Sequence, residues 1–156
     1  MWGTRNVLAA SRAVGVTHVV NLSTDKAADP SSVLGYTKRV GEQLTASYGA
    51  GAAGSYVSVR FGNVLGSRGS VAETFTRQIE AGLPVTVTHP DVRRYFMTVD
   101  EACEVILLAA AVGRPGEALI PDMGEPVRIV DLAERLMTQL GRRVSVELTG
   151  QRPGEK

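Results

Sequence analysis

A hydroxyl, a carboxylate and an amine stand next to one another directly after a short apolar segment. Residues 17–22 (THVVNL) are rich in β-branched side chains and predict a buried strand, and Ser23, Thr24, Asp25 and Lys26 follow it. In open parallel sheets, ligands bind beyond the carboxyl ends of the strands. In that position the hydroxyl can orient a substrate while the carboxylate and the amine exchange protons with it. The competing interpretation is a solvated turn in which Asp25 simply pairs with Lys26.

The helix predicted next, over residues 33–48, carries Lys38. A tyrosine one turn earlier would share a helix face with this lysine, and the ammonium would lower the pKa of the phenol so that the phenolate takes a proton. The chain has Leu34 at that position instead. Tyr36 lies about 200° around the helix from Lys38 and cannot replace the missing tyrosine. Lys38 is therefore either part of a site or an ordinary surface lysine.

Arginines recur near predicted strand ends and in loops. Their planar fork binds phosphate oxygens two at a time, so several that converged would suit a diphosphate. Asn63 and the glycines around it could direct backbone N–H groups at the same oxygens. Taken one at a time, each arginine is an ordinary solvated surface group. The arginines are Arg60, Arg68, Arg93, Arg94 and Arg152, and the glycines are Gly62, Gly66 and Gly69.

The sequence gives little support for a metal site or a disulfide. His18 falls in an apolar strand and His89 precedes a proline, and neither has a second histidine at ligand spacing. Cys103 is the single cysteine of the chain, which excludes an intrachain disulfide. It lies on an apolar helix, and we expect it to pack in the core. The sequence therefore predicts no metal.

Alternating helices and strands position these residues. The strands at 17–22 and 56–61 are separated by the helix at 33–48, which implies a parallel crossover and an α/β class. Ser31 or Ser32 is expected to cap that helix, and Asp100 is expected to cap a later one. The predicted helices span about 6–14, 33–48, 71–79, 100–111 and 129–140, and the predicted strands span 17–22, 56–61, 84–88, 118–120 and 144–148.

Composition narrows the function classes. The chain has 156 residues, 44% of them hydrophobic, which fits a single folded domain. Its 17 basic and 16 acidic side chains leave a net charge of +1, so the basic excess of a nucleic-acid-binding protein is absent. No apolar run approaches the ~20 residues that span a bilayer, and the first residues have no signal-peptide core. We expect a soluble cytoplasmic protein.

Six strings of the sequence, in a fixed order between Asn6 and Lys156, match one protein family. They are LSTDKAADP, LGYTKR, VRFGNVLGSRGSV, PVTVTHPDVRRYFMT, DMGEPVRIVDLA and TGQRPGEK. As a set they resemble the CapD-like nucleotide-sugar 4,6-dehydratases of polysaccharide biosynthesis, which are members of the extended short-chain dehydrogenase/reductase superfamily. Any one of the strings would be weak evidence, whereas the set is highly specific.

The resemblance implies a partial Rossmann-like parallel sheet with helices, plus a small C-terminal lobe that binds a sugar nucleotide. Residues 1–62 would belong to the NAD(P)-binding fold and residues 63–156 to the sugar-nucleotide part, the two being intertwined in one CapD-like domain. Such enzymes use NADP or NAD to oxidise C4 of a UDP-sugar, eliminate water across C5 and C6, and return the hydride to C6. The implied substrate is UDP-N-acetylglucosamine. A UDP-hexose C4-epimerase and a non-catalytic interaction module are the alternatives.

The resemblance also implies roles for residues at the end of the first strand. Thr24 corresponds to the hydroxyl of the superfamily's catalytic set, and Asp25 and Lys26 correspond to the acid and base of the elimination. Lys38 corresponds to the lysine that contacts the nicotinamide ribose. Leu34 stands where many relatives have tyrosine, so one option is that Asp25 takes the proton of the C4 hydroxyl.

Four further residues correspond to the family's substrate-binding positions. Asn63 resembles the residue whose backbone meets the diphosphate, and Val87 lies on the strand that faces the nucleobase. Arg94 and Arg152 resemble the two arginines that bind the diphosphate.

The 156 residues contain no glycine-rich dinucleotide turn, so the resemblance indicates an incomplete member of the family. We expect the chain to bind UDP-sugars but not to turn them over on its own. Its expected partners are a UDP-sugar and either a second copy of the chain or a missing N-terminal half. Neither nucleic acid nor a membrane segment is expected.

Overall fold

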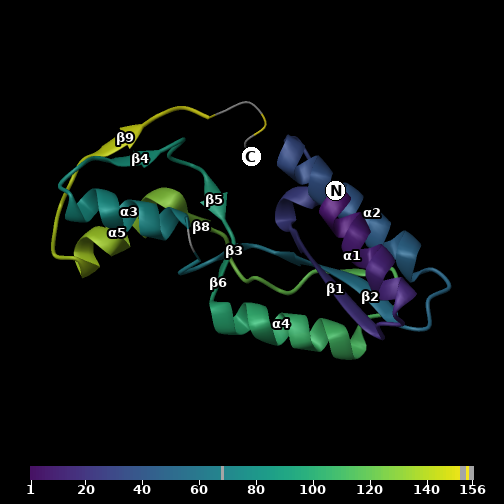
Figure 1. Cartoon of the computed structure of the whole chain (residues 1–156). Coiled ribbons are helices and arrows are strands. Elements are labelled where there is room, and N and C mark those ends of the chain that lie inside the picture. The colour runs from purple at the N-terminus through teal and green to yellow at the C-terminus, as the bar shows by residue number, and fades with distance from the viewer. Residues whose placement is uncertain (68, 152–153, 155–156) are drawn as a thin grey trace. The chain divides into compact units, whose positions relative to one another are not determined.

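The computed structural model describes residues 1–67, 69–151 and 154, and the chain folds into two compact units (Figure 1). Unit 1 comprises Met1–Phe61 and Asp100–Asp122, and unit 2 comprises Gly62–Val99 and Met123–Lys156. The chain therefore crosses between the units three times. Residues 100–122 return to unit 1, where they form a helix beside the sheet and its third strand.

Unit 1 is built on a parallel sheet in the order β1-β2-β7. β1 (His18–Thr24) and β2 (Ser55–Phe61) pair in register over their whole length, and β7 (Ala118–Leu119) pairs with the other edge of β2. β2 has neighbours on both sides and is buried from its second residue to its last, as is typical of a central parallel strand. The predicted α/β class is confirmed.

Helices flank this sheet. α1 (Trp2–Ala13) and α2 (Val33–Gly49) pack against each other, α2 also lies on β1 and β2, and α4 (Val99–Val112) lies on the other side of these strands in Figure 1. Ser32 Oγ caps α2 by accepting a hydrogen bond of 3.2 Å from the Gly35 N–H, which confirms one of the two predicted caps. The predicted cap of α4 is wrong, because the helix already begins at Val99. Asp100 lies within its first turn, where a carboxylate still interacts favourably with the helix N-terminus.

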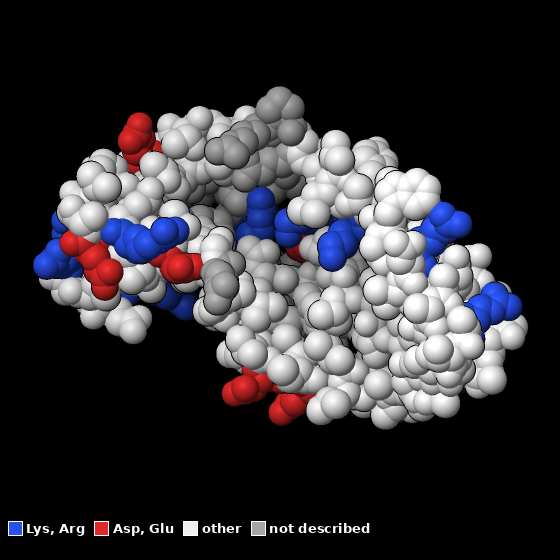
Figure 2. All heavy atoms as spheres, viewed as in Figure 1, with Lys and Arg blue, Asp and Glu red and all other residues white. Residues whose placement is uncertain are grey.

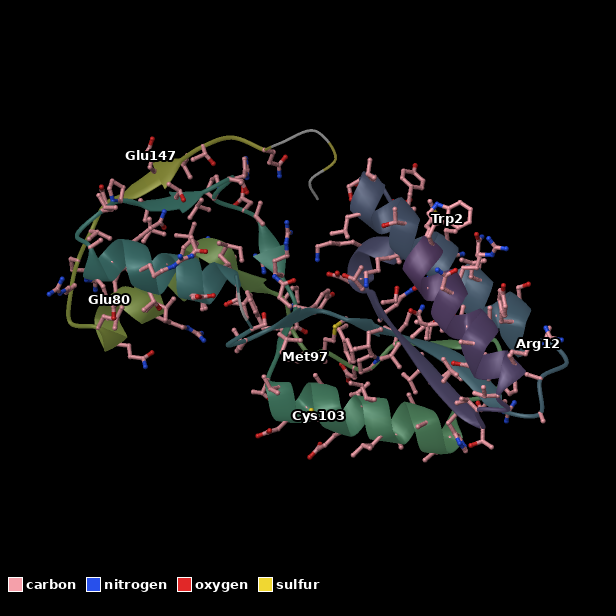
Figure 3. The ribbon with its side chains drawn as sticks, in the orientation of Figure 1. Trp2, Arg12, Glu80, Met97, Cys103 and Glu147 are labelled. Atoms are coloured by element: carbon pink, nitrogen blue, oxygen red, sulfur yellow. The ribbon has the colours of Figure 1, made fainter. Side chains whose placement is uncertain are left out.

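α4 is apolar on more than one side. Its buried residues are Ala102 and Ala109, whereas Leu107 and Leu108 are exposed. Cys103, labelled in Figure 3, is also exposed, so the expectation that it packs in the core is wrong. Successive helical residues are about 100° apart, so a face centred on Ala102 turns Cys103 away from the sheet. None of the described helices combines the length and the apolar character needed to cross a membrane.

Unit 2 combines short strand pairs with α3 (Val71–Glu80) and α5 (Ile129–Gln139), which pack against each other. Its surface charges pair locally: Arg128 lies 2.7 Å from Asp131, and basic and acidic side chains alternate over the α3–α5 part of the surface in Figure 2. The strand pairs are β3 (Asn63–Val64) with β6 (Phe96–Met97) and β4 (Val85–Val87) with β9 (Val146–Leu148), both parallel, and β5 (Arg93–Arg94) with β8 (Val127–Arg128), antiparallel.

One apolar core joins α3, α5 and β4 of unit 2. Phe75 and Ile79 enter it from α3, and Ala133 and Met137 enter it from α5. These residues are one turn apart on each helix, as the apolar stripes in the sequence predict. Val87 contributes from β4. Each large side chain buried in this way stabilises the unit by roughly 1.5–3 kcal/mol relative to its exposure to water.

A glycine allows α2 to approach the turn that follows β1, η1 (Asp25–Ala27), very closely. A Cβ on Gly35 would lie 2.6 Å from the Lys26 carbonyl oxygen and 3.1 Å from Pro30 Cβ, so either the turn or the helix would have to move. Gly41 on the same helix differs, because a Cβ there would meet Asn21 Nδ2 at 3.8 Å, an ordinary contact.

We expect Gly35→Ala to lower the free energy of unfolding by about 1–3 kcal/mol, the usual effect of forcing a methyl group into a closely packed contact. Gly41→Ala is the matched control on the same helix. It should leave stability unchanged or raise it by up to about 1 kcal/mol, because alanine is the better helix former. Urea unfolding of both variants measures the difference, and equal effects at the two positions would contradict the close approach at Gly35.

Candidate functional site

The residues after β1 form a hydrogen-bonded cluster around one carboxylate oxygen. Thr24 Oγ1 donates to Asp25 Oδ1 at 2.7 Å, and Lys26 Nζ donates to the same oxygen at 3.0 Å. The Lys26 N–H in turn donates to Thr24 Oγ1 at 3.4 Å. We call these three residues the strand-end cluster. The Asp25 and Lys26 side chains are 25% and 37% exposed, so a ligand can reach both of them.

Asp25 is held in its ionised form. Burial raises the pKa of this carboxyl, but the hydrogen bonds from Thr24 and Lys26 and the charge of Lys26 outweigh burial, so the pKa lies below its ordinary value. A carboxylate that is ionised at neutral pH accepts a proton rather than donating one. In this state Asp25 can accept a proton or orient a ligand, and it can act as an acid only after it has taken up a proton.

Lys38 lies at the same end of β1. Its Nζ donates a hydrogen bond of 3.0 Å to the carbonyl oxygen of Leu22, two residues before Thr24. An ammonium has three N–H donors. Within the described chain one of them is used in this way, so two are available to hydroxyl oxygens of a ligand. The two residues that would have completed or replaced a tyrosine–lysine pair, Leu34 and Tyr36, are 56% and 58% exposed.

A buried acid that the sequence analysis missed lies one helical turn after Lys38. The side chain of Glu42 is only 5% exposed, and both of its oxygens are bound by Arg60: Nε donates to Oε1 and Nη2 donates to Oε2, each at 2.8 Å. Ser23 Oγ donates to Oε1 at 2.6 Å, and Arg39 donates to Oε2 from the surface side at 3.3 Å. We call Ser23, Glu42 and Arg60 the buried ion-pair network.

The buried ion-pair network corrects one prediction. Arg60 was counted among the arginines that could bind a diphosphate, but its Nε and Nη2 both donate to Glu42, and the side chain is buried inside unit 1. Hydrogen bonding to Glu42 raises the pKa of Arg60 further, against the effect of burial. Burial raises the pKa of Glu42, but Arg60 and Ser23 outweigh it and lower the pKa overall. Both groups are therefore charged at neutral pH.

The presence of Glu42 on the helix between the two strands, together with Arg60 on the second strand, could have predicted the buried pair. Ser23 and Arg60 are direct partners in the register of β1 and β2, so they project from the same face of the sheet. An acid on the helix between the two strands, with an arginine near the end of the second strand, indicates a buried pair. Sequence spacing alone did not separate this arginine from those in loops.

The predicted substrate-binding residues of the described chain meet in unit 2. Asn63, Val87 and Arg94 line one cavity of about 170 Å³. The backbone N–H of Asn63, which the resemblance assigned to the diphosphate, already donates to the Tyr95 carbonyl oxygen at 2.8 Å. Arg94 Nη1 donates to the Arg93 carbonyl oxygen at 2.8 Å. Arg152 and Arg68 lie outside the described residues.

No group of three histidine, cysteine, aspartate or glutamate side chains gathers at metal-binding distance in the part of the chain that the structure describes. His18 Nδ1 lies 3.0 Å from the neighbouring Thr17 hydroxyl, and His89 Nδ1 accepts from the Asp91 N–H at 3.2 Å. Both contacts are local.

A parallel sheet with helices on both faces, and with polar side chains at the carboxyl ends of its strands, is the arrangement of a Rossmann-type nucleotide-binding fold. The chain belongs to the polysaccharide biosynthesis protein family, whose sequence model matches residues 1–156. The family resemblance drawn from the six strings is thereby confirmed.

The chain spans only part of the length of the individual proteins that it matches. It is 49% identical, over 99% of its length, to the capsular polysaccharide biosynthesis protein CapD of Staphylococcus aureus, of which it covers 26%. The structure of Pen from Bacillus thuringiensis matches the whole chain with a TM-score of 0.91 and 34% identity, and the chain covers 50% of it. The structure of MoeE5 in complex with UDP-glucose and NAD matches 99% of the chain with a TM-score of 0.89 and 24% identity, and the chain covers 58% of it. At this identity the match shows a shared fold.

Removing one partner of the buried ion-pair network is expected to be costly. Glu42→Gln leaves Arg60 buried without a counter-charge and should lower the free energy of unfolding by about 3–5 kcal/mol. The double variant Glu42→Met with Arg60→Met removes both charges and should cost much less than the single variant. Urea unfolding measures both, with Asp131→Asn in the exposed Arg128 pair as a control that should change little. A double variant less stable than Glu42→Gln would contradict this account.

Stability should fall in acid. The folded state lowers the pKa of both Asp25 and Glu42, so their contribution to stability is fully present above their unfolded pKa values and is lost as pH falls through the folded values. We expect a nearly constant free energy of unfolding from about pH 6 to 8 and a decline below about pH 4. The decline should be shallower in Glu42→Gln. Urea titrations at several pH values test this, and an unchanged acid slope in the variant would contradict it.

Proposed function

We propose that the chain carries the reacting groups of a UDP-N-acetylglucosamine 4,6-dehydratase of surface-polysaccharide biosynthesis. The observation that carries this proposal is the strand-end cluster, in which an ionised Asp25 is held between a hydroxyl and an ammonium at the carboxyl end of a parallel strand. Membership of the polysaccharide biosynthesis family and the close relation to CapD support it. A C4-epimerase needs no proton transfer at C5, so the Asp25–Lys26 pair favours the dehydratase.

The chain's groups suit a nicotinamide cofactor at this strand end. The two remaining N–H donors of Lys38 can bind the paired hydroxyls of a ribose, and Thr24 lies two residues beyond the carbonyl that anchors Lys38. Bound NAD or NADP supplies the hydride acceptor for C4 and the hydride that returns to C6. In this proposal Lys38 orients the ribose and Thr24 orients the sugar hydroxyl.

Asp25 takes the proton of the C4 hydroxyl in the proposed reaction, because Leu34 cannot ionise in place of a tyrosine. Once protonated, Asp25 becomes the acid that donates to the departing C6 hydroxyl, which leaves as water. Oxidation at C4 makes the C5 proton more acidic. Lys26 is an ammonium at rest, so it takes the C5 proton only after it has passed its own proton to Asp25, which has just given one to the departing C6 hydroxyl. The 3.0 Å contact between Lys26 Nζ and Asp25 Oδ1 gives a direct path for protons between the two groups.

The UDP part of the sugar nucleotide is assigned to the residues around the cavity of unit 2, whose volume of about 170 Å³ is too small for the whole molecule. Arg94 supplies a positive charge for the diphosphate, and Val87 supplies an apolar wall for the nucleobase. Asn63 contributes its side chain rather than its backbone N–H, because the latter is bound to Tyr95. Arg152 is assigned to the diphosphate as well, on the basis of the family resemblance alone.

The direct test incubates the protein, in the longest form in which it is produced naturally, with UDP-N-acetylglucosamine and NAD or NADP. A product lighter by one water molecule supports the proposal. Asp25→Asn should lower the rate of its formation roughly 10²–10⁴-fold, whereas Asp100→Asn, an exposed aspartate on α4, should leave the rate close to that of the unmodified protein.

Other outcomes identify the alternatives. A product of unchanged mass with inverted C4 would identify a C4-epimerase and reject the dehydratase. Failure to bind UDP, UDP-N-acetylglucosamine or NAD(P) would reject both enzymes and leave an interaction module. Mass spectrometry of the products and calorimetric titration of each nucleotide separate these cases.

A further inference from the structure

We infer that Glu42 is a positioning residue that holds Lys38 at the carboxyl end of β1, and that the buried charge of Arg60 fixes Glu42 for this purpose. The inference deepens the proposed function, because that function gives Lys38 its contact with a bound ligand. The contacts that support it all lie within unit 1.

Two consecutive residues of β1 bind two residues one turn apart on α2. The Leu22 carbonyl accepts from Lys38 at 3.0 Å, and the Ser23 hydroxyl donates to Glu42 at 2.6 Å. Positions i and i+4 lie on the same helix face. The helix is therefore attached to the strand at two points, and the second point sets the rotation and the height of the first.

Arg60 removes the remaining freedom of the Glu42 carboxylate. Its fork binds both oxygens at 2.8 Å, which fixes the plane of the carboxylate and leaves Oε1 directed at Ser23. Because Arg60 pairs with Ser23 in the sheet register, donors from β1 and β2 meet at a single acceptor on α2. The three elements thus share one rigid contact next to Lys38.

Stability alone does not explain the pair. Apolar residues of similar volume commonly hold a fold as well as a buried ion pair does, so the charges contribute direction more than net stability. The close approach at Gly35 fixes the start of α2 against η1, whereas a Cβ on Gly41, one residue before Glu42, would meet its nearest neighbour at an ordinary 3.8 Å. The hydrogen bonds of Glu42 therefore add a directional contact between α2 and β1 one turn after Lys38.

The lysine content of the chain allows a direct test. The sequence has three lysines, Lys26, Lys38 and Lys156. Reductive methylation with ¹³C-formaldehyde gives each a dimethylamine signal in a ¹H–¹³C spectrum, and a dimethylammonium keeps one N–H for the Leu22 carbonyl. Lys26→Arg and Lys38→Arg variants assign the signals, and the signals of the urea-unfolded chain give the reference for an unrestrained lysine.

In the double variant Glu42→Met with Arg60→Met, we expect the Lys38 signal to move most of the way to the unfolded reference while the Lys26 signal stays in place. Far-UV circular dichroism and the thermal midpoint confirm that the variant is folded. Arg39→Met is the matched control, because it removes an exposed charge from the same helix and retains the Glu42–Arg60 contact. In that variant the Lys38 signal should be unchanged.

A folded double variant with an unchanged Lys38 signal would overturn the inference and leave the pair a purely structural one. Should the double variant not fold, Ser23→Ala decides the question, because it removes the 2.6 Å hydrogen bond and keeps the ion pair. A Lys38 signal identical to that of the unmodified chain would then overturn the inference, whereas a displaced signal supports it.

The lysine signals also separate this inference from the proposed function. Their positions in the ligand-free variants report on Lys38 alone, without substrate or cofactor. Calorimetric titration of the unmethylated chain with NADP, NAD and UDP-N-acetylglucosamine then tests the function. A Lys38 signal that depends on Glu42, together with an unmethylated chain that binds none of these nucleotides, would uphold the positioning role and reject the ligand contact.

Discussion

The parallel register of β1 and β2 is the constraint on which unit 1 depends. It sets Ser23 beside Arg60 and ends both strands together, at Thr24 and Phe61. A shift of one residue would turn Ser23 to the opposite face of the sheet and separate it from Glu42. The same shift would place a different residue at the carboxyl end of β1. The pairing of β1 with β2 therefore sets both the buried contact of Ser23 with Glu42 and the exposed cluster that begins at Thr24, the next residue of β1.

Two carboxylates in this unit have pKa values lowered for similar reasons but differ in access. Asp25 is 25% exposed and receives its hydrogen bonds from its immediate neighbours in sequence, so a ligand can replace one of them. Glu42 is 5% exposed and is bound by three separate residues from β1, β2 and α2. A lowered pKa alone would have made both carboxylates candidates for a catalytic role. The difference lies in burial and in where the hydrogen-bond donors come from. Asp25 is accessible and bound by its sequence neighbours, whereas Glu42 is buried and bound by residues of three elements.

Local patterns in the sequence predicted most of the secondary structure, because apolar spacing directly reflects which face of an element is buried. The stripes of α3 and α5 and the strands around residues 17–22 and 56–61 are examples. The errors concern tertiary context. Arg60 lies at a strand end like the loop arginines, and only the position of α2 above it shows that it is buried. Cys103 lies on an apolar helix whose buried face is narrow, so composition misjudged its exposure. The return of residues 100–122 to the first sheet depends on a long-range pairing with β2 that no local pattern contains.

The leucine at position 34 makes the site chemically different from one with a tyrosine–lysine pair. Leu34 lies one turn before Lys38 on α2 and has no group that can accept a proton. In the proposed reaction Lys38 therefore acts as a hydrogen-bond donor and a positive charge, and another element has to supply the proton acceptor. Asp25 meets the electrostatic requirement for that role, because its neighbours hold it ionised at neutral pH. A carboxylate is a weaker base than a phenolate, so in the proposed reaction the loss of the hydride from C4, rather than the strength of the base, drives the proton transfer. With a weak base, more of the rate has to come from the orientation of the reacting groups. The positions of Lys38 and the strand-end cluster then matter more than in a site with a strong base.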